Sequence, residues 1–561
     1  MRWQCGRALL GGGWLAAVAC AASAQVPDAG RILRESTPPQ PIRPAPPTAL
    51  QLPPAAPVPA NAPNQPSFVL KSVKLNGNTV FSSSTLQALV ADRLGQSVTL
   101  ADLQLLAARV TAYYRNADYV LTQTVVPVQD VTGGQVEFSV LEGRLGRIKI
   151  ERVNEVPIPD SMIEGVVSGL PKGRPLTQHE LERAVLMLSD IPGMATQVSL
   201  EAGDESGTYD LIIEVKAAPP YSLSVDLDNQ GSRATGEYRI GAMGRINSPF
   251  GRGDNLDLRL LNSFGKGLTF GRAAYELPIG YSGLRASLAY ARVQYELGKD
   301  FAALDAYGTA DVVELAATYP LLRSRIQNLF GKVTLEFKQL NDQVGAAGLA
   351  SKKRTQNLGV GFVYERRDNQ LGGGYVSAGL TGYAGKLDIR SQADLLADQD
   401  IFGRHTNGNF ARASYQLSRL QALSATTSAY LAIAGQWANK NLDSADKIAV
   451  GGPRTVRAFS SSTGIGDEAR ILNAELRWSV TPDASVSAFY DIGQVRTNHT
   501  AAAGEDNHRT LSGYGLGLYW TVAGGMALRA SLAWPYLNTG TSATGKDERS
   551  PRAFGQIVKM F

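Results

Sequence analysis

Beyond residue 217, apolar and polar residues alternate in one short segment after another. Leu256, Leu258 and Leu260, for example, alternate with Asp257 and Arg259. A period of two is that of a β-strand whose two faces meet different surroundings. Later segments with the same period are Leu284–Tyr290, Val333–Phe337 and Leu472–Trp478. Clusters of Gly, Asn, Asp and Ser separate these segments, so the sequence predicts a mainly β, antiparallel sheet of many strands.

The size of this region decides between two kinds of β protein. Its 344 residues, from 218 to 561, suffice for roughly 16 strands at about 20 residues for each strand with its turn. In a soluble sandwich the apolar faces would form the core. In a membrane barrel they would face lipid, and the charged faces would line a wet lumen. One sandwich of this size is unusual, so the sequence favours a 16-stranded antiparallel transmembrane β-barrel.

Residues 1–24 are predicted to be a secretory signal peptide. Arg2 and Arg7 give this segment a positive start, an apolar run follows, and Ala22-Ser23-Ala24 has the form of a cleavage site. The alternative is a lipid anchor on Cys20. Both cysteines of the chain, Cys5 and Cys20, lie in this segment. The mature chain would therefore have no thiol for a disulfide, a metal site or a nucleophile.

The remaining sequence gives no sign of an enzyme or of a nucleic-acid-binding protein. The full chain has 55 Lys and Arg against 50 Asp and Glu, too even a balance to predict nucleic-acid binding. No Ser has Gly both two residues before and two residues after it. Residues 540–547 nearly match a phosphate-binding loop, but Asp547 stands where Ser or Thr is required. The histidines are scattered, at His179, His405, His499 and His508. We therefore expect no catalytic residue, cofactor or metal.

Two segments of about 75 residues, 67–142 and 143–217, share one predicted element order, β-α-α-β-β. The first unit is predicted to contain Phe68–Leu75, Ser84–Leu94, Leu100–Tyr114, Val120–Val126 and Gln135–Leu141. The second is predicted to contain Arg147–Val153, Ser161–Val167, Leu176–Leu188, Ala195–Leu200 and Tyr209–Lys216. A linker, residues 25–66, precedes both units. It begins with a possible short helix, Asp28 to Glu35, for which Asp28 is the expected cap, and continues as an extended Pro- and Ala-rich segment.

Two motifs near the C-terminus point to one contact inside the barrel. The first is Val456-Arg457-Ala458-Phe459, and the second is Phe489-Tyr490-Asp491-Ile492-Gly493. By strand alternation, Asp491 and Glu475 point away from the apolar face and into the lumen. Because the planar guanidinium of Arg457 matches a carboxylate in bidentate geometry, we predict an Arg457–Asp491 contact with Glu475 nearby. The alternative is that all three are ordinary lumen charges that face water.

With these features the chain resembles the TpsB transporters of two-partner secretion, the haemolysin secretion/activation family. The resemblance covers the whole mature chain. It implies a periplasmic N-terminal helix and linker, two periplasmic α+β POTRA domains, and a 16-stranded barrel that ends in an aromatic residue, here Phe561. It further implies that Val456–Phe459 is the tip of a loop near 450–469 that folds back into the barrel. Ala458 replaces the usual Gly of this motif, and it would be strained if the tip needs a positive φ. Phe489, Asp491 and Gly493 match the family's second motif, on a barrel strand.

The function implied by the resemblance is export across the outer membrane of a Gram-negative bacterium. The partner would be a large secreted exoprotein, bound through its N-terminal secretion domain. Lipid and the barrel-assembly machinery would be further partners. A client strand would add to an exposed strand edge of a POTRA domain, and apolar side chains would line the groove: Leu176, Leu181, Val185, Tyr209, Leu211 and Ile213. The Arg457 loop, and in part the N-terminal helix, would block the pore at rest. The alternatives are a barrel-assembly insertase and a passive porin or receptor barrel.

Overall fold

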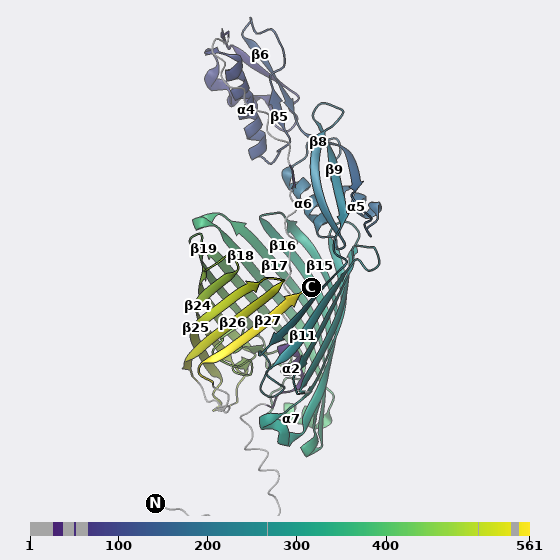
Figure 1. Ribbon diagram of the computed structural model, residues 1–561, viewed down its shortest axis with the longest axis vertical. Coiled ribbons are helices and arrows are strands. Elements are labelled where there is room, and N and C mark those ends of the chain that lie inside the picture. Colours follow the sequence, from purple (N-terminus) through teal and green to yellow (C-terminus); the bar gives the residue numbers. More distant parts are fainter. Residues whose placement is uncertain (1–25, 37–49, 52–65, 266, 503, 540–548) are drawn as a thin grey trace, which may run out of the picture.

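The computed structural model describes residues 26–36, 50–51, 66–265, 267–502, 504–539 and 549–561. It shows a barrel with two small domains at one end (Figure 1). The predicted signal peptide, most of the Pro-rich linker and the loop at 540–547 lie outside the described residues.

Sixteen antiparallel strands, each hydrogen-bonded to its neighbours along the chain, close into the barrel. The strands are β10 (Tyr221–Asp228), β11 (Arg239–Asn247), β12 (Asn255–Ser263), β13 (Leu268–Ile279), β14 (Leu284–Glu296), β15 (Ala306–Arg323), β16 (Gln327–Val344), β17 (Leu349–Asp368), β18 (Gly374–Ile389), β19 (Gly408–Ala422), β20 (Thr427–Ala438), β23 (Glu468–Ser479), β24 (Ala484–Arg496), β25 (His508–Val522), β26 (Met526–Asn538) and β27 (Arg552–Met560). The fold class predicted from the alternation is confirmed.

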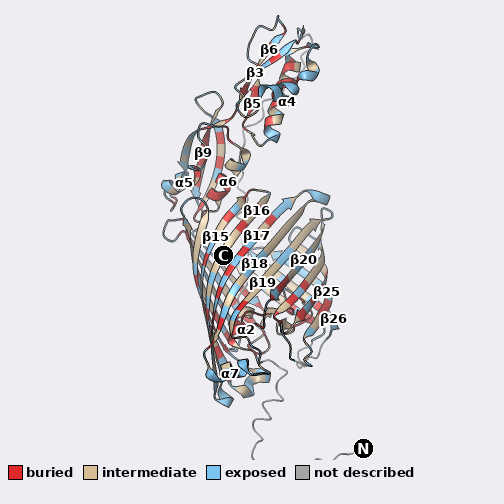
Figure 2. Cartoon of the chain, turned by 180° about the vertical axis from the view of Figure 1, so that it is seen from behind, coloured by how far each residue is buried: buried red, intermediate tan, exposed pale blue. Residues whose placement is uncertain are grey.

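The predicted apolar rows lie on the outer face of the barrel. Leu258, Leu260, Leu335 and Phe337 are all among the exposed large hydrophobic residues, and Figure 2 shows this exterior as mostly exposed or intermediate. Arg259, which alternates with two of them, points inward and pairs with Asp226. None of the helices in the described part of the chain is both long and apolar enough to cross a membrane.

The barrel closes between its first and last strands. β10 pairs with β27 over five residues, from Ser224 opposite Met560 to Asp228 opposite Gln556. The backbone N–H of the terminal Phe561 donates to the Leu223 carbonyl at 2.9 Å. Lys559 lies on the apolar face, as the sequence suggests, and its ammonium donates to the Gly524 carbonyl in the turn before β26. The long side chain therefore reaches a polar group at the barrel rim.

The first N-terminal domain has the predicted order, with two additional short strands. Its elements are β2 (Phe68–Val69), β3 (Ser72–Asn76), α3 (Ser83–Ala88), a 3₁₀ turn (Ala91–Arg93), β4 (Ser97–Val98), α4 (Leu100–Asn116), β5 (Gln123–Val125) and β6 (Gln135–Leu141). Thr99 and Asp102 form a capping box that starts α4. Leu103, Leu106, Val110 and Tyr114 of this helix are buried against the sheet, as their spacing predicts.

The second domain consists of β7 (Arg144–Arg152), α5 (Asp160–Val167), α6 (Gln178–Ser189), β8 (Met194–Ala202) and β9 (Thr208–Ala217). A capping box of Thr177 and Glu180 starts α6. Leu176 therefore precedes the helix, and the prediction that it opens α6 is wrong. The sheet order is β1-β8-β9-β7, in which β9 is central. The outer edge of β8 pairs in parallel with β1 (Leu50–Gln51), a piece of the chain's own linker.

Candidate functional site

The connection between β20 and β23, residues 439–467, folds into the barrel, and we call it the lumen loop. It contains the short strands β21 (Ile448–Ala449) and β22 (Ile465–Gly466). Val450, Val456 and Phe459 of the lumen loop are buried against the inner wall of the barrel, where Ile471 and Leu511 belong to the same apolar cluster. The loop is therefore packed against the wall, not suspended in water.

Arg457 at the tip of the lumen loop meets the predicted carboxylates. Its Nε donates to Asp491 Oδ2 and its Nη2 to Asp491 Oδ1, both at 2.8 Å. Its Nη1 donates to Glu475 Oε1 at 2.6 Å. The guanidinium carbon lies 3.4 Å from the centre of the Phe489 ring. The structure thus brings together three residues of the two motifs, Arg457, Phe489 and Asp491. Glu475, predicted from strand alternation, joins them. The fork of hydrogen bonds to Asp491 has the bidentate geometry that only an arginine can supply.

The side chain of Asp491 has no exposed surface, and it accepts hydrogen bonds from both the lumen loop and β23. Its Oδ2 also accepts from the backbone N–H of Arg457 at 3.1 Å. Asn473, missed in the sequence, donates to Asp491 Oδ1 and to the Thr455 carbonyl, each at 2.7 Å. Because a buried carboxylate is stable only when charged and hydrogen-bonded partners surround it, Asp491 depends on the loop staying in place.

Glycines in the wall leave room for the loop. A Cβ on Gly493 would lie 2.2 Å from Val450 Cγ1, and a Cβ on Gly513 would lie 2.4 Å from Ala458 Cβ. Gly493 is a predicted site residue, and its place is now explained by the close approach of the loop. Ala458 is not among the residues with positive φ. The strain that a positive φ would have caused there is therefore absent.

The stem of the lumen loop is held by ion pairs that the sequence analysis did not identify. Lys338 Nζ lies 3.1 Å from Asp446 Oδ1, and Lys353 Nζ lies 2.8 Å from Asp443 Oδ2. Arg412 also reaches Asp446, at 3.3 Å. The alternation in β16 and β17 places Lys338 and Lys353 in the lumen, but it does not say which loop acid each one meets.

The helix α2 (Ala29–Ser36) lies inside the barrel at the end away from the N-terminal domains (Figures 1 and 2). Asp28 caps it as predicted, accepting from the Arg31 backbone N–H at 3.0 Å. One side of α2 touches the wall, where the Ala29 N–H donates to Asp342 Oδ1 at 2.7 Å. The other side touches the lumen loop: Arg34 donates to the carbonyls of Ser444 and Lys447 at 2.9 and 2.7 Å.

An apolar patch on the inner wall receives α2. Ile32 and Leu33 pack in a cluster that includes four inward residues from one register row of neighbouring strands: Phe270, Val293, Ala310 and Leu340. The prediction that the inner faces line a wet, charged lumen is therefore wrong for this part of β13–β16. Alternation along a strand distinguishes its two faces but does not show what covers each face. An inner face covered by a helix is as apolar as an outer face covered by lipid.

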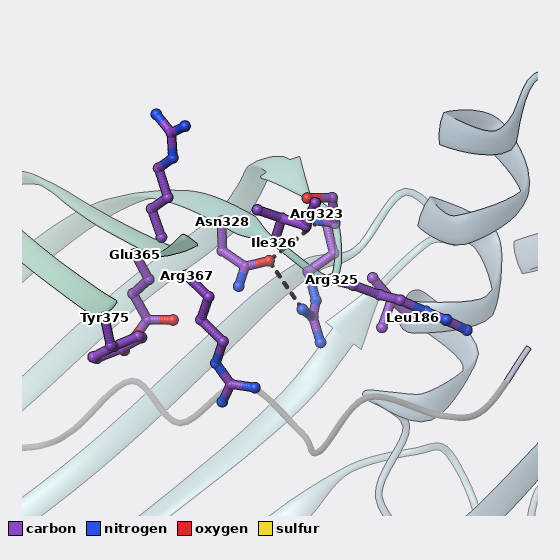
Figure 3. Close-up of a pocket in the computed structure, with 10 residues that line it drawn as sticks. Leu186, Arg323, Arg325, Ile326, Asn328, Glu365, Arg367 and Tyr375 are labelled. Carbon is purple, nitrogen blue, oxygen red and sulfur yellow. Dashed lines mark hydrogen bonds between the residues drawn. The ribbon is translucent and has the colours of Figure 1, made fainter. Parts of the chain in front are cut away.

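The second domain is attached to the barrel rim by a buried ion pair. Arg323, at the end of β15, is only 2 % exposed, and it contacts both oxygens of Asp190, which ends α6, at 2.8 and 2.9 Å. Arg323 also donates to Asn328 Oδ1 at 3.0 Å. A small cavity lies beside this pair, bordered by Leu186 of α6 and by Arg367 of β17 (Figure 3). The domain is thus fixed to one side of the barrel rim, at the end of β15 (Figure 1).

Five of the six residues proposed to line a client groove do not face solvent. Leu176, Leu181, Val185, Leu211 and Ile213 are at most 2 % exposed and form the core of the second domain. Tyr209 is half-buried against the same core. The proposed groove is therefore wrong, because side chains at core spacing on α6 and β9 pack against each other.

Comparisons with known proteins agree with this architecture. Residues 207–520 match the family described as haemolysin secretion/activation protein ShlB/FhaC/HecB, and residues 68–143 match the ShlB-type POTRA domain. The heme/hemopexin transporter protein HuxB of Haemophilus influenzae strain 86-028NP is 27% identical over 482 residues, which cover 84% of each chain.

Two further similarities extend the comparison. The outer membrane transporter CdiB of Escherichia coli is 23% identical over 478 residues, covering 82% of this chain and 76% of CdiB. The solved structure of CdiB from Escherichia coli superposes with a TM-score of 0.69 at 20% identity, covering 90% of this chain and 94% of that one. The structural similarity supports the same fold.

Proposed function

This chain belongs to the haemolysin secretion/activation (ShlB/FhaC/HecB) family, and from that premise we propose how its parts move a partner protein across the membrane. It is an outer-membrane transporter of two-partner secretion, with its POTRA domains in the periplasm, and it exports a secreted partner protein. We propose that this partner is a large exoprotein bound through its N-terminal secretion domain, and that transport involves no catalytic step. Membrane lipid and the barrel-assembly machinery are its proposed partners during biogenesis.

The client-binding edge in this proposal is the outer edge of β8. β9 is central in its sheet and has no free edge, whereas the described residues place two linker residues on the outer side of β8. Leu50 pairs with Val198, and Gln51 pairs with Ser199. An extended client segment can make the same main-chain hydrogen bonds over more residues. We therefore propose that the client strand displaces residues 50–51 from β8.

The resting pore in this proposal is closed by α2 and the lumen loop together. The observation that supports it is the continuous contact from the wall through α2 to the loop stem, and from the loop tip to Asp491. Export then requires that both move aside. The Arg457 contact is proposed to act as a latch that favours the inward position of the loop.

Co-expression with a candidate large secreted protein tests export and the β8 edge in one assay. The wild-type chain is expected to release that protein into the medium. The double variant Gln51→Cys/Ser199→Cys, which can tether the linker to β8, is expected to secrete poorly until a reductant is added. The single variant Gln51→Cys is the control. Secretion without the transporter would contradict the export function, and full secretion by the oxidised double variant would contradict only the β8 proposal.

A further inference from the structure

A cluster of cations lies on the outer face of the barrel, at the end opposite the POTRA domains. Arg354 and Gln356 of β17 and Lys386 and Asp388 of β18 line a hollow of about 180 Å³ together with Arg390, the residue after β18. Since the POTRA domains are periplasmic, this end of the barrel is extracellular. Three cations and one carboxylate give the hollow a net charge of +2.

The strand register shows that these side chains point away from the lumen. In β17, Arg354, Gln356 and Leu358 are exposed, while Thr355 and Asn357 between them are buried. Arg354 pairs with Asp388, and Gln356 pairs with Lys386, so the four side chains share one face. The next residues of that face in β17 are Leu358, Val360 and Phe362, all exposed and apolar. The cluster therefore begins where the apolar outer surface ends.

Within the described chain, Arg354 and Lys386 have no hydrogen-bonded or ionic partner on their side chains, whereas Arg390 pairs with Asp388 at 2.5 Å. The same register row contains a contrasting cation: Arg292 of β14 also points outward, but it pairs with Asp311 at 3.1 Å. At the periplasmic end, Arg419 is neutralised by Asp368 at 2.9 Å. Two unneutralised cations over one hollow are thus a local feature of β17 and β18.

The surface directly below the hollow is lined by small side chains. Ala384 and Gly382 follow Lys386 on the outer face of β18, and their partners in β19 are Ala411 and Ala413. A Cβ on Gly382 would meet nothing within 4 Å. Leu358 and Val360 are their partners on the β17 side. This is a shallow apolar strip in which straight hydrocarbon chains can lie against the barrel.

We propose that this surface binds an outer-leaflet lipid whose sugar headgroup carries phosphates, a lipid of the lipid A class. The phosphate oxygens would accept charge-assisted hydrogen bonds from Arg354 and Lys386, and the acyl chains would lie along the strip below. Arg354 suits phosphate binding because the planar fork of its guanidinium matches the geometry of the phosphate oxygens. Asp388 opposes the bound anion, so its charge lowers the affinity. The inference does not depend on what the transporter exports.

The full chain, purified in detergent, allows a direct test by native mass spectrometry with bisphosphorylated lipid A as the probe. The Arg354→Gln/Lys386→Gln variant is expected to bind it roughly tenfold more weakly than wild type. Dephosphorylated lipid A and phosphatidylglycerol are expected to bind wild type weakly. The matched control, Arg292→Gln/Arg366→Gln, removes the same charge from outward cations elsewhere and is expected to bind like wild type. A shift in gel mobility on heating verifies that each barrel is folded.

A second variant, Asp388→Asn, is expected to change the affinity in the opposite direction. It should bind lipid A more tightly than wild type, because a negative charge that repels the phosphates is gone. The proposal is overturned if Arg354→Gln/Lys386→Gln binds like wild type, or if its control loses as much affinity. It is also overturned if dephosphorylated lipid A or phosphatidylglycerol binds wild type as tightly as bisphosphorylated lipid A, or if Asp388→Asn weakens binding.

Discussion

Arg457 satisfies three partners at once, and no other residue type can do so. It donates two parallel hydrogen bonds to Asp491, a third to Glu475, and stacks its guanidinium on Phe489. A lysine would retain the charge, but its compact ammonium can neither form the fork nor stack in the same way. The contact therefore depends on the planar shape of the group as much as on its charge.

We expect Arg457→Ala to insert normally into the outer membrane but to secrete its partner protein about tenfold less. Removal of Arg457 leaves Asp491 buried and poorly compensated, and the loop loses the defined inward position from which transport is proposed to start. Arg457→Lys should secrete at an intermediate level. The measurement is partner protein in the medium relative to folded barrel in the membrane. Arg477→Ala is the control, since Arg477 meets Glu475 from the same strand. Normal secretion by Arg457→Ala would reject the latch.

Glu142 has a comparable role in the first POTRA domain. Its carboxylate accepts from the backbone N–H groups of Thr79 and Val80 at 2.7 and 2.8 Å and from the Tyr114 hydroxyl at 2.8 Å. Burial raises the pKa of Glu142, but these hydrogen bonds outweigh burial and leave the pKa below its ordinary value. Burial, and then the Glu142 carboxylate, raise the pKa of Tyr114, so the phenol remains a donor. Glu142 thereby fixes the turn after β3 to the end of β6.

We expect Glu142→Gln to destabilise this domain by about 1–3 kcal/mol at neutral pH, because the neutral amide loses the charge that strengthens these hydrogen bonds, and its NH₂ group replaces the oxygen that accepts from the Thr79 hydroxyl. Since the pKa of Glu142 is lowered on folding, its stabilising contribution is complete above the ordinary carboxyl pKa of about 4.3. It is lost as the pH falls through the lower, folded value. Hydrogen exchange of residues 68–143, corrected for the intrinsic rate, measures both effects. An equal loss in Glu151→Gln, which alters an exposed carboxylate of β7, would contradict this account.

At the scale of elements, period two and period 3.6 predicted most of the fold. Gln135–Leu141 is β6 at both ends, and α4 starts at the predicted Leu100. The strand predicted at 120–126 forms only over Gln123–Val125. A local pattern identifies a face but not the length over which a neighbouring strand pairs with it.

The family resemblance implied a helix in the pore, but the wall contacts of α2 and the pairing of residues 50–51 could not be predicted from the sequence. An eight-residue helix is marginal alone, and α2 is stable here because Ile32 and Leu33 meet apolar wall residues far away in the chain. Leu50–Gln51 carries no strand pattern, and it pairs because β8 offers an edge. The Arg457 contact was predictable because alternation along a strand determines that the side chains of Asp491 and Glu475 point into the lumen. Asp443 and Asp446 lie on a loop, where no such alternation shows the direction of a side chain, so their ion pairs were not predictable.

At the scale of the whole molecule, two observations bear on how the periplasmic domains are joined to the barrel. The Asp190–Arg323 pair joins the second POTRA domain to the barrel rim. Residues 50–51, which follow α2 in sequence, lie on β8 of that same domain. In our proposal, a client strand that displaces these two residues acts on the segment that leads to α2 in the lumen. Client binding and opening of the pore would then be coupled through the linker.

The resting conductance of the barrel tests this arrangement. α2 is about 12 Å long at 1.5 Å per residue, shorter than the bilayer core of about 30 Å, so it fills only part of the length of the pore. We expect a variant lacking residues 25–37 to conduct more than wild type in planar bilayers, and addition of Arg457→Ala to raise the conductance further. Arg31→Ala is the control, because among the described residues the side chain of Arg31 pairs within the helix alone, with Glu35 at 3.0 Å. Unchanged conductance in the deletion variant would mean that the lumen loop alone closes the pore.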